Sequence, residues 1–450
     1  MIETVQIQAA FQALRAGRRA MRATTAEQRI ELLENLRAEI QRRKTDIIEA
    51  IHQDLGRPLT DEGEFATIMG NIDMVHAHLK EWMEPVTVEK SPTSPEAEAI
   101  YIKYEPRGVV LLFGTWDFPF GMFFSPLIQA VAAGNTVLGK TSSMAPASGT
   151  VAAEIVRAVF GPDQVAVFEA DDVETTADGR SLNNVLLDLP VDHIFLTGSP
   201  KVGKEIVKAA SRHLATFTLE LGGKSPAILD ETADLDLAAG AFVGGKAGYQ
   251  GQTCLSVDYV WVPEGLRDTF IEKYAAALQR AYYVDGEYQL DRDQRIVNRR
   301  NYDRVKGYLT EAVERGAKVA FGGSTWDDEL TIEPTVLLDT PLDTDVVQEE
   351  IFGPILPVMT YTDVEEIFAH SDSLGKPLGF YIYSEDQQFI DHILDNTTSG
   401  GVTVNGHVVH WLEENLPFGG VNSSGYGRYH GVWGFRELSN TRSVFHVKTT

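Results

Sequence analysis

The sequence predicts an α/β fold with parallel strands, divided into more than one domain. From residue 101 onwards, short apolar runs alternate with segments that suit helices, as at 109–113 (VVLLF), 135–139 (NTVLG) and 193–197 (HIFLT). This alternation is typical of βαβ units, in which a helix connects two parallel strands. Because 450 residues are too many for a single hydrophobic core, we expect two or three domains.

The segment before these runs is helical. Apolar residues recur at helical spacing through residues 26–55, which predicts one amphipathic helix. Thr25 and Gln28 have the spacing of a capping box at its start, and Gly56 followed by Pro58 marks its end.

Charge and hydropathy exclude two classes of partner. The chain has 39 Lys and Arg against 65 Asp and Glu, a net charge of −26, which repels nucleic acid and anionic lipid head groups. The most apolar stretch, residues 122–133, contains polar residues and is shorter than the ~20 residues of a membrane-spanning helix. We therefore expect neither nucleic acid nor a membrane as a partner.

The cysteine content and the N-terminal segment suggest a compartment. The only cysteine, Cys254, cannot form an internal disulfide, so nothing requires an oxidising environment. The first residues lack the basic start, apolar core and cleavage site of a signal peptide. A cytoplasmic protein is expected.

One turn has the parts of an anion or dinucleotide site. The strand expected at 193–197 leads through Gly198 and Ser199 into helix-compatible sequence at 201–214. A strand, a tight turn and a helix N-terminus together favour anion binding. No G-x-G-x-x-G follows an expected strand, so these residues alone leave dinucleotide binding open. Strands expected at 259–262 and 355–359 continue the alternation.

Two residues are candidates for chemistry. Cys254 follows a glycine-rich turn, where a thiol can act as a nucleophile, although a lone cysteine is also commonly a small buried hydrophobe. Glu220 interrupts an apolar run, and burial would raise its pKa as a general base near neutral pH requires. A salt-bridged structural glutamate is the alternative.

Three motifs carry a resemblance to a known family. They are LELGGKSP at 219–226, GQTC at 251–254 and EEIFGP at 349–354. With these motifs in this order, the chain resembles the aldehyde dehydrogenase superfamily from about Arg15 to Val444. The short N-terminus and the ending NLPFGGVNSSGYGRYHG are most similar to the class 3 and fatty-aldehyde branch, which is typically dimeric.

The resemblance implies NAD(P)-dependent oxidation of an aldehyde to a carboxylic acid. Cys254 would attack the aldehyde as a thiolate and carry a thiohemiacetal and then a thioester. Glu220 would activate the water that hydrolyses the thioester. Because CoA-acylating relatives generally lack this glutamate, it favours free acid as the product, and CoA-dependent acylation remains the alternative among enzymes.

The resemblance also implies a set of cofactor residues for NAD or NADP. Glu350 would bind the nicotinamide ribose with Phe352 beside it, and Lys140 would reach the adenosine ribose. Gly198 and Ser199 would approach the pyrophosphate. The complete expected set is Trp116, Lys140, Ser143, Gly198, Ser199, Gly203, Leu221, Gly222, Glu350 and Phe352.

Two positions depart from the family pattern. Asp117 stands where the family usually has an asparagine that donates to the oxyanion of the thiohemiacetal. Our hypothesis is that an apolar surround keeps Asp117 protonated, so that it still donates. The alternative is a slow enzyme, or a catalytically impaired homologue with a binding or structural role. Ser143 stands where relatives often carry an acid that disfavours NADP, so the preference between NAD and NADP stays open.

Aromatic residues suggest an apolar tunnel for an aromatic or medium-to-long aliphatic aldehyde, although such residues are also common in cores. The candidate lining residues are Trp116, Phe118, Phe124, Trp411 and Phe418. His407 and His410 precede two glutamates but lack the H-E-x-x-H arrangement. We therefore expect no metal there and interpret both histidines as solvated loop residues.

The resemblance implies an aldehyde dehydrogenase-like architecture. A Rossmann-type NAD(P)-binding domain is expected at 1–220, interrupted near 85–100 by an oligomerisation excursion. An α/β catalytic domain at 221–425 and a small C-terminal oligomerisation segment at 426–450 would follow, and two subunits would form a homodimer.

Overall fold

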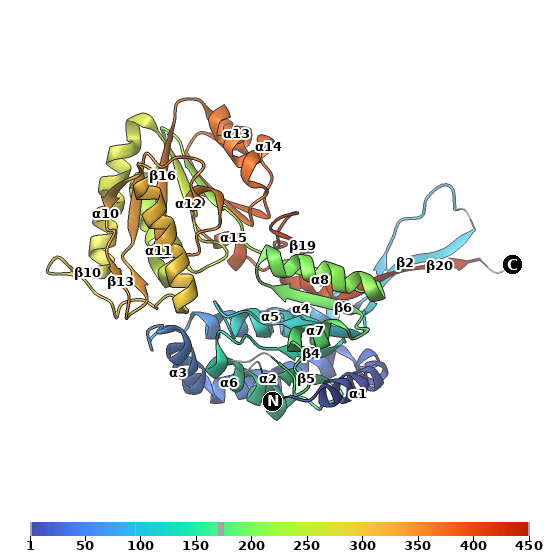
Figure 1. Ribbon diagram of the computed structural model, residues 1–450. Coiled ribbons are helices and arrows are strands. Elements are labelled where there is room, and N and C mark those ends of the chain that lie inside the picture. Colours follow the sequence, from blue (N-terminus) through green and yellow to red (C-terminus); the bar gives the residue numbers. More distant parts are fainter. Residues whose placement is uncertain (1, 95, 170–174, 449–450) are drawn as a thin grey trace.

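The fold is built on two large sheets, both mainly parallel. A third, antiparallel sheet projects away from them (Figure 1). The computed structural model describes residues 2–94, 96–169 and 175–448. The expected α/β architecture with parallel strands is confirmed.

The first sheet has six strands, and its chain order reverses in the middle. In spatial order the strands are β19 (Gly425–Tyr426), β7 (Thr216–Glu220), β6 (His193–Thr197), β3 (Val109–Phe113), β4 (Thr136–Lys140) and β5 (Val165–Phe168). All pairs are parallel except β19 with β7. From β3 the chain adds β4 and β5 on one side and later β6 and β7 on the other. The boundary between β3 and β6 is therefore a topological switch point, where open α/β sheets bind ligands beyond the carboxyl ends of their strands.

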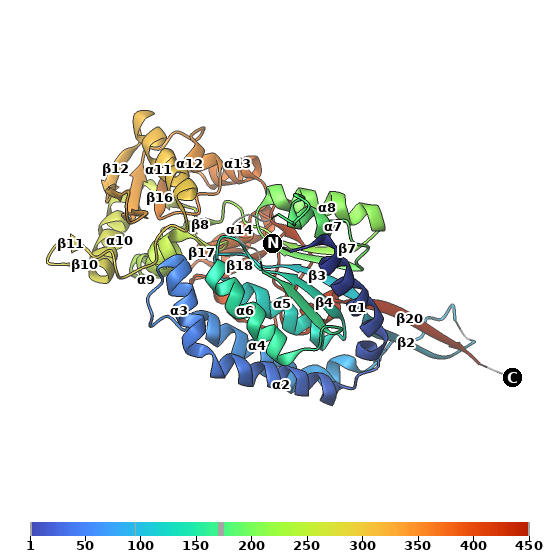
Figure 2. The ribbon, with the colours of Figure 1, turned by 60° about the horizontal axis from the view of Figure 1, so that its bottom comes forward.

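Helices cover both faces of this sheet, which explains why its strands are continuous apolar runs. In β3, Val110 and Leu112 pack into one hydrophobic cluster, while Val109, Leu111 and Phe113 pack into another on the opposite face. The helices on the first face are α2 (Ala26–Arg42), α3 (Lys44–Leu55), α4 (Gly63–Met83), α5 (Gly121–Ala132), α6 (Pro146–Val159) and α16 (Gly431–Glu437). Figure 2 shows α2, α3 and α6 side by side. Those on the second face are α1 (Thr4–Arg22), α7 (Leu182–Leu187) and α8 (Pro200–His213).

The helix expected at 26–55 is two helices, which corrects that prediction. Arg43 separates α2 from α3 with φ −101° and ψ 16°. The apolar positions stay in phase across the break, because Ile40 and Ile47 lie two helical turns apart and are both buried. The periodicity therefore does not reveal the break. The capping box of Thr25 and Gln28 is present as expected.

The second sheet has seven strands. In spatial order they are β12 (Lys318–Phe321), β15 (Thr335–Leu338), β16 (Ile355–Tyr361), β9 (Tyr259–Pro263), β8 (Pro226–Leu229), β17 (Gly379–Tyr383) and β18 (Gly401–Val404). Its larger helices are α9 (Leu235–Phe242), α10 (Arg267–Tyr282), α11 (Arg299–Glu314), α13 (Val364–Leu374) and α14 (Gln387–Asn396), and its short ones are α12 (Asp345–Gln348) and α15 (Val409–Leu412). Two small hairpins, β10 (Tyr283–Val284) with β11 (Glu287–Tyr288) and β13 (Thr325–Trp326) with β14 (Thr331–Ile332), lie at its margin.

The third sheet forms an arm that extends away from both bodies (Figures 1 and 2). It consists of β1 (Val86–Thr87), β2 (Ala97–Pro106) and β20 (Ser439–Val447), all antiparallel. Segments far apart in the sequence thus meet in one ribbon. Among the described residues, none of the helices is long and apolar enough to span a membrane.

Candidate active site

Cys254 lies just after an irregular helical turn that several contacts hold in place. The chain forms a π-helical turn at Val243–Ala247 and a 3₁₀ turn at Gly248–Gly251, in which Tyr249 and Gln250 have positive φ. The carboxylate of Asp293 stabilises this strained geometry by accepting from both of their backbone N–H groups, at 2.9 and 3.0 Å. Gly251 is required because a Cβ there would lie 2.3 Å from the carbonyl oxygen of Gly353.

Glu220 ends β7 as a buried carboxylate. Its side chain is 3% exposed, and neither carboxylate oxygen has a hydrogen-bond partner among the described residues. Burial raises the pKa of Glu220 well above its usual range, while the charge of Arg428 opposes this shift and that of Glu437 adds to it. A carboxyl group with a raised pKa and unpartnered oxygens is suited to accept a proton near neutral pH.

Carboxyl groups from three distant segments affect the thiol of Cys254. Its pKa is raised well above the usual range, first by burial and then by the carboxyl groups of Asp117, Glu350 and Glu220. Charge interactions between side chains weaken with distance, so these groups lie near enough to Cys254 to affect its pKa. Cys254, Glu220, Asp117 and Glu350 are therefore candidates for one common site.

Glu350 is held against the glycines that follow β7. The backbone N–H of Gly223 donates to Glu350 Oε1 at 3.1 Å, and a Cβ on Gly222 would lie 2.0 Å from the same oxygen. Burial and the charge of Asp258 raise the pKa of Glu350 to about 8. Asp258 is itself bound to two buried lysines, with Lys224 Nζ at 2.6 Å.

The remaining cofactor candidates lie at the carboxyl ends of the first sheet. Ser199 caps α8 by accepting from the backbone N–H of Val202 at 3.4 Å, directly after β6 and Gly198. Gly203 lets α8 approach β7, because a Cβ there would lie 3.1 Å from a methyl group of Leu221. Lys140 ends β4, and Ser143 follows it.

An aromatic contact completes this side of the site. The rings of Trp116 and Phe352 meet edge to face with centroids 5.5 Å apart, and Phe352 has a φ of 46°. The switch point, the helix N-terminus of α8 and the buried Glu350 carboxylate together fit a pyridine dinucleotide. The unpartnered oxygens of Glu220 fit a water or reacting group beside it.

Asp117 lies in the loop between β3 and α5 and is 4% exposed. Burial raises its pKa, while a hydrogen bond from Thr115 Oγ1 at 2.8 Å and the charge of Arg57 lower it. Asp117 is therefore buried, and a hydroxyl group and a cation oppose the effect of burial on its pKa.

The candidate lining residues do not all gather in one place. Trp116, Phe124, Trp411 and Phe418 belong to the hydrophobic cluster that also contains Cys254. Phe124 is fully buried among Phe120 and Phe123, whereas Trp411 and Phe418 both contact the ring of His430. Phe118 packs elsewhere, against Tyr249 with centroids 5.4 Å apart.

The two histidines near the C-terminus are not solvated, which corrects that prediction. His410 is 9% exposed and shares a hydrogen bond of 2.7 Å with Thr403 Oγ1. His407 Nε2 lies 3.0 Å from the carbonyl oxygen of Leu255. Burial lowers the pKa of both imidazoles to about 4. Within the described residues, no three His, Cys, Asp or Glu side chains are grouped to hold a metal ion.

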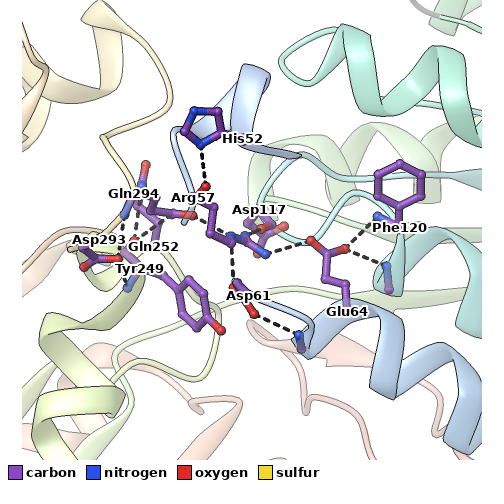
Figure 3. A network of polar contacts seen from close by, with 12 residues as sticks. His52, Arg57, Asp61, Glu64, Asp117, Phe120, Tyr249, Gln252, Asp293 and Gln294 are labelled. Atoms are coloured by element: carbon purple, nitrogen blue, oxygen red, sulfur yellow. Dashed lines mark hydrogen bonds and ion pairs between the residues drawn. The ribbon is translucent and has the colours of Figure 1, made fainter. Parts of the chain in front are cut away.

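Two residues that the sequence reasoning missed also belong to the site. Tyr429 is buried, and the charges of Glu220, Cys254 and Asp117 all raise its pKa. Arg57 contacts the loop of Asp117 from a distant helix connection (Figure 3). Arg57 stands in none of the quoted motifs, and Tyr429 lies in the quoted ending NLPFGGVNSSGYGRYHG without any sign there of a role in the site.

Comparison with known proteins agrees with this geometry. The family model described as "Aldehyde dehydrogenase family" matches residues 1–444. AldX of Bacillus subtilis (strain 168) is 42% identical, over 98% of this chain and 97% of its own length. Aldehyde dehydrogenase family 3 member A2 of Rattus norvegicus is 37% identical, over 97% of this chain and 87% of its own length.

A solved structure supports the same assignment. The structure titled "Substrate bound state of Staphylococcus Aureus AldH" has a TM-score of 0.91 and 34% identity, and covers 98% of this chain and 94% of its own. Nothing in these comparisons favours a CoA-acylating enzyme or a catalytically impaired homologue. The chain belongs to the aldehyde dehydrogenase family, alongside family 3 relatives, and oxidises an aldehyde to a carboxylic acid with NAD or NADP.

Proposed function

We propose that Cys254 is the nucleophile and Glu220 the general base of this oxidation. Two observations support the proposal. Glu220 is buried with both carboxyl oxygens unpartnered among the described residues, and it contributes to the raised pKa of Cys254 from 34 positions away in the sequence. The Cys254 thiol first gives up its proton to solvent. The thiolate then attacks the aldehyde carbon, and the carbonyl electron pair moves to oxygen to give the anion of a thiohemiacetal. The cofactor, which Glu350 and Phe352 would hold, would supply the hydride acceptor for this oxidation, and Cys254 would then carry a thioester.

Hydrolysis of the thioester then uses Glu220. Its carboxylate removes a proton from water, the resulting hydroxide attacks the thioester carbon, and the C–S bond breaks to release the acid and the Cys254 thiolate. Asp117, kept neutral by burial, and the backbone N–H of Cys254 are proposed to donate to the oxyanion.

The cofactor is proposed to lie across the switch point of the first sheet. Glu350 would hold the nicotinamide ribose, with Phe352 and Trp116 packed beside it. Gly198, Ser199 and the N-terminus of α8 would face the pyrophosphate, and Lys140 and Ser143 would lie near the adenosine ribose. Between the nicotinamide and adenosine ends of the cofactor, the binding surface is proposed to include Gly203, Leu221 and Gly222.

The substrate is proposed to be an aromatic or medium-to-long aliphatic aldehyde. Trp116, Trp411 and Phe418 share a hydrophobic cluster with Cys254, which supports an apolar approach to the thiol. Phe124 would act as support beneath this surface because it is fully buried. Phe118, which packs on Tyr249, is the least supported of the lining residues.

We further propose that the protein is a cytoplasmic homodimer. Within each subunit, the domain boundaries are proposed to lie near residues 220 and 425. The arm is the proposed contact between subunits, since Phe445 and Val447 on β20 are 44% and 58% exposed, and exposed apolar strands tend to pair. The sheets support the boundaries, because β8 begins the second sheet at Pro226 and β19 returns to the first at Gly425. The single cysteine is compatible with a reducing compartment.

An aldehyde panel assayed with NAD and NADP, with and without CoA, tests this function. We expect CoA-independent NAD(P)H formation, free acid as product, and no NAD(P)H from Cys254→Ala. Strict dependence on CoA, or unchanged activity of Cys254→Ala, would overturn the proposal.

A further inference from the structure

Arg57 is a buried cation in the connection between α3 and α4, far in sequence from every motif. Its side chain is 2% exposed, and a buried guanidinium must be hydrogen-bonded and paired to be tolerated. Figure 3 shows Arg57 at the centre of a polar network, with Asp117 and Glu64 on one side and Tyr249 and Gln294 on the other.

One side of this network holds the loop of Asp117. Arg57 Nη2 donates to the backbone carbonyl oxygen of Asp117 at 2.5 Å, and Nη1 donates to Glu64 Oε1 at 2.8 Å. The other oxygen of Glu64 accepts from the backbone N–H groups of Phe120 and Gly121, both at 2.8 Å. Arg57 and Glu64 together therefore fix the loop from Asp117 to the start of α5.

The other side holds the turn before Cys254. Arg57 Nε donates to Gln294 Oε1 at 3.0 Å, and Gln294 Nε2 donates to the backbone carbonyl oxygen of Tyr249 at 2.8 Å. The guanidinium carbon lies 4.7 Å from the ring centroid of Tyr249 and 4.9 Å from that of Phe118. The side chain of Arg57 thus contacts both the loop that contains Asp117 and the turn that precedes Cys254.

We propose that Arg57 is a positioning residue that sets the placement of Asp117 relative to Cys254. This inference rests on the roles proposed for these two residues. Arg57 acts through the loops and does not touch the substrate. Its planar, five-donor group meets three acceptors and two rings at once, a geometry that lysine cannot reproduce.

The test compares Arg57→Lys with Arg29→Lys, a matched control. Arg29 is also buried, at 3% exposed, and donates to the backbone carbonyl oxygen of Ala132 at 2.8 Å, but none of its hydrogen bonds reaches the site loops. We expect Arg57→Lys to lower kcat/KM for the aldehyde about 100-fold, as a misplacement of roughly 1 Å does, with the KM for cofactor within about twofold of wild type. In Arg29→Lys, kcat/KM for the aldehyde should fall less than about threefold, although its unfolding temperature should change by a similar amount.

A second readout does not depend on turnover. Because Cys254 is the only cysteine, its alkylation rate by iodoacetamide, followed by intact mass, reports on the placement of the thiol alone. We expect a changed rate in Arg57→Lys and an unchanged rate in Arg29→Lys. If Arg57→Lys does not fold, Gln294→Met removes the hydrogen bonds that join Arg57 through Gln294 to the backbone of Tyr249 and keeps those from Arg57 to Glu64 and Asp117. It should change both readouts in the same direction.

The double variant separates positioning from general damage. If Arg57 and Gln294 act through one network, the combined loss of kcat/KM is smaller than the product of the single losses. The inference would be overturned if Arg57→Lys and Arg29→Lys changed kcat/KM and the alkylation rate equally. It would also be overturned if the loss of kcat/KM in the double variant equalled the product of the losses in Arg57→Lys and Gln294→Met. Wild-type protein without aldehyde-dependent NAD(P)H formation would instead overturn the proposed function, while the alkylation comparison would still test the placement of Cys254.

Discussion

Gly222 leaves the space that the carboxylate of Glu350 occupies, since a Cβ at this glycine would lie 2.0 Å from Glu350 Oε1. We predict that Gly222→Ala displaces Glu350 and raises the KM for NAD(P) about tenfold or more, with a stability loss of about 1–3 kcal/mol from overpacking. Cofactor titration and thermal unfolding measure the two effects. Gly240→Ala is the control, because a Cβ there would meet nothing within 4 Å. A cofactor KM in Gly222→Ala equal to that of the control would contradict the role of Glu350.

Glu220→Gln should stop the reaction after the first half. The amide cannot accept a proton from water, so we predict a fall in kcat of about 10²- to 10⁴-fold with a retained single-turnover burst of NAD(P)H. Intact mass should show an acyl group on Cys254. In the wild type, hydrolysis should rise with pH, because the pKa of Glu220 is raised by burial and only its ionised form acts as a base. Loss of the burst together with kcat would show that Glu220 acts before the thioester forms.

Most candidate residues of this site follow from the resemblance to the family, and several of them lie where a parallel sheet brings residues together. Glu220 ends β7, Gly198 follows β6 and Lys140 ends β4, so all three lie at the same edge of the first sheet. The apolar run of β3 was recognisable because both of its faces are buried.

Other features depend on contacts between distant segments and have no local signal. Arg57 meets its acceptors only after α3, the loop at 117–121 and Gln294 are assembled. The sequence around His410 is typical of a polar loop, yet His410 is buried. Its ring occupies space that Gly401 leaves free, because a Cβ at Gly401 would lie 2.6 Å from the ring atom Cδ2. The break at Arg43 is hidden because the apolar spacing continues through it.

Ser143→Glu should shift the cofactor preference towards NAD. A carboxylate at this position would repel a 2′-phosphate, so we predict a fall of about tenfold, or ~1.4 kcal/mol, in the ratio of kcat/KM for NADP to that for NAD. Initial rates with both cofactors give this ratio. Ser142→Glu adds the same charge one position earlier and is the control. An equal shift in both variants would mean that Ser143 does not face the adenosine ribose.

His410 should make the protein sensitive to acid. Its folded pKa of about 4 lies below the unfolded value of about 6.5, so its stabilising contribution is present above pH 6.5 and is lost as the pH falls towards 4. We predict that the wild type loses about 2 kcal/mol more unfolding free energy between pH 7 and pH 5 than His410→Asn, whose amide can keep the bond to Thr403. Urea unfolding at both pH values measures this. Parallel losses in the two proteins would show that His410 does not titrate in this range.

Asp117→Asn tests whether a neutral carboxyl group replaces the usual amide. Burial raises the pKa of Asp117, and below that pKa its protonated form can donate to the oxyanion as asparagine would. We therefore predict less than about a tenfold difference in kcat at neutral pH. As the pH rises, Asp117 ionises and its donor is lost, so the ratio of variant to wild-type kcat should increase. Thr115→Val removes a hydrogen bond that favours the ionised form and should move this increase to higher pH. A variant at least about tenfold faster throughout the neutral range would show that Asp117 is ionised there and repels the oxyanion.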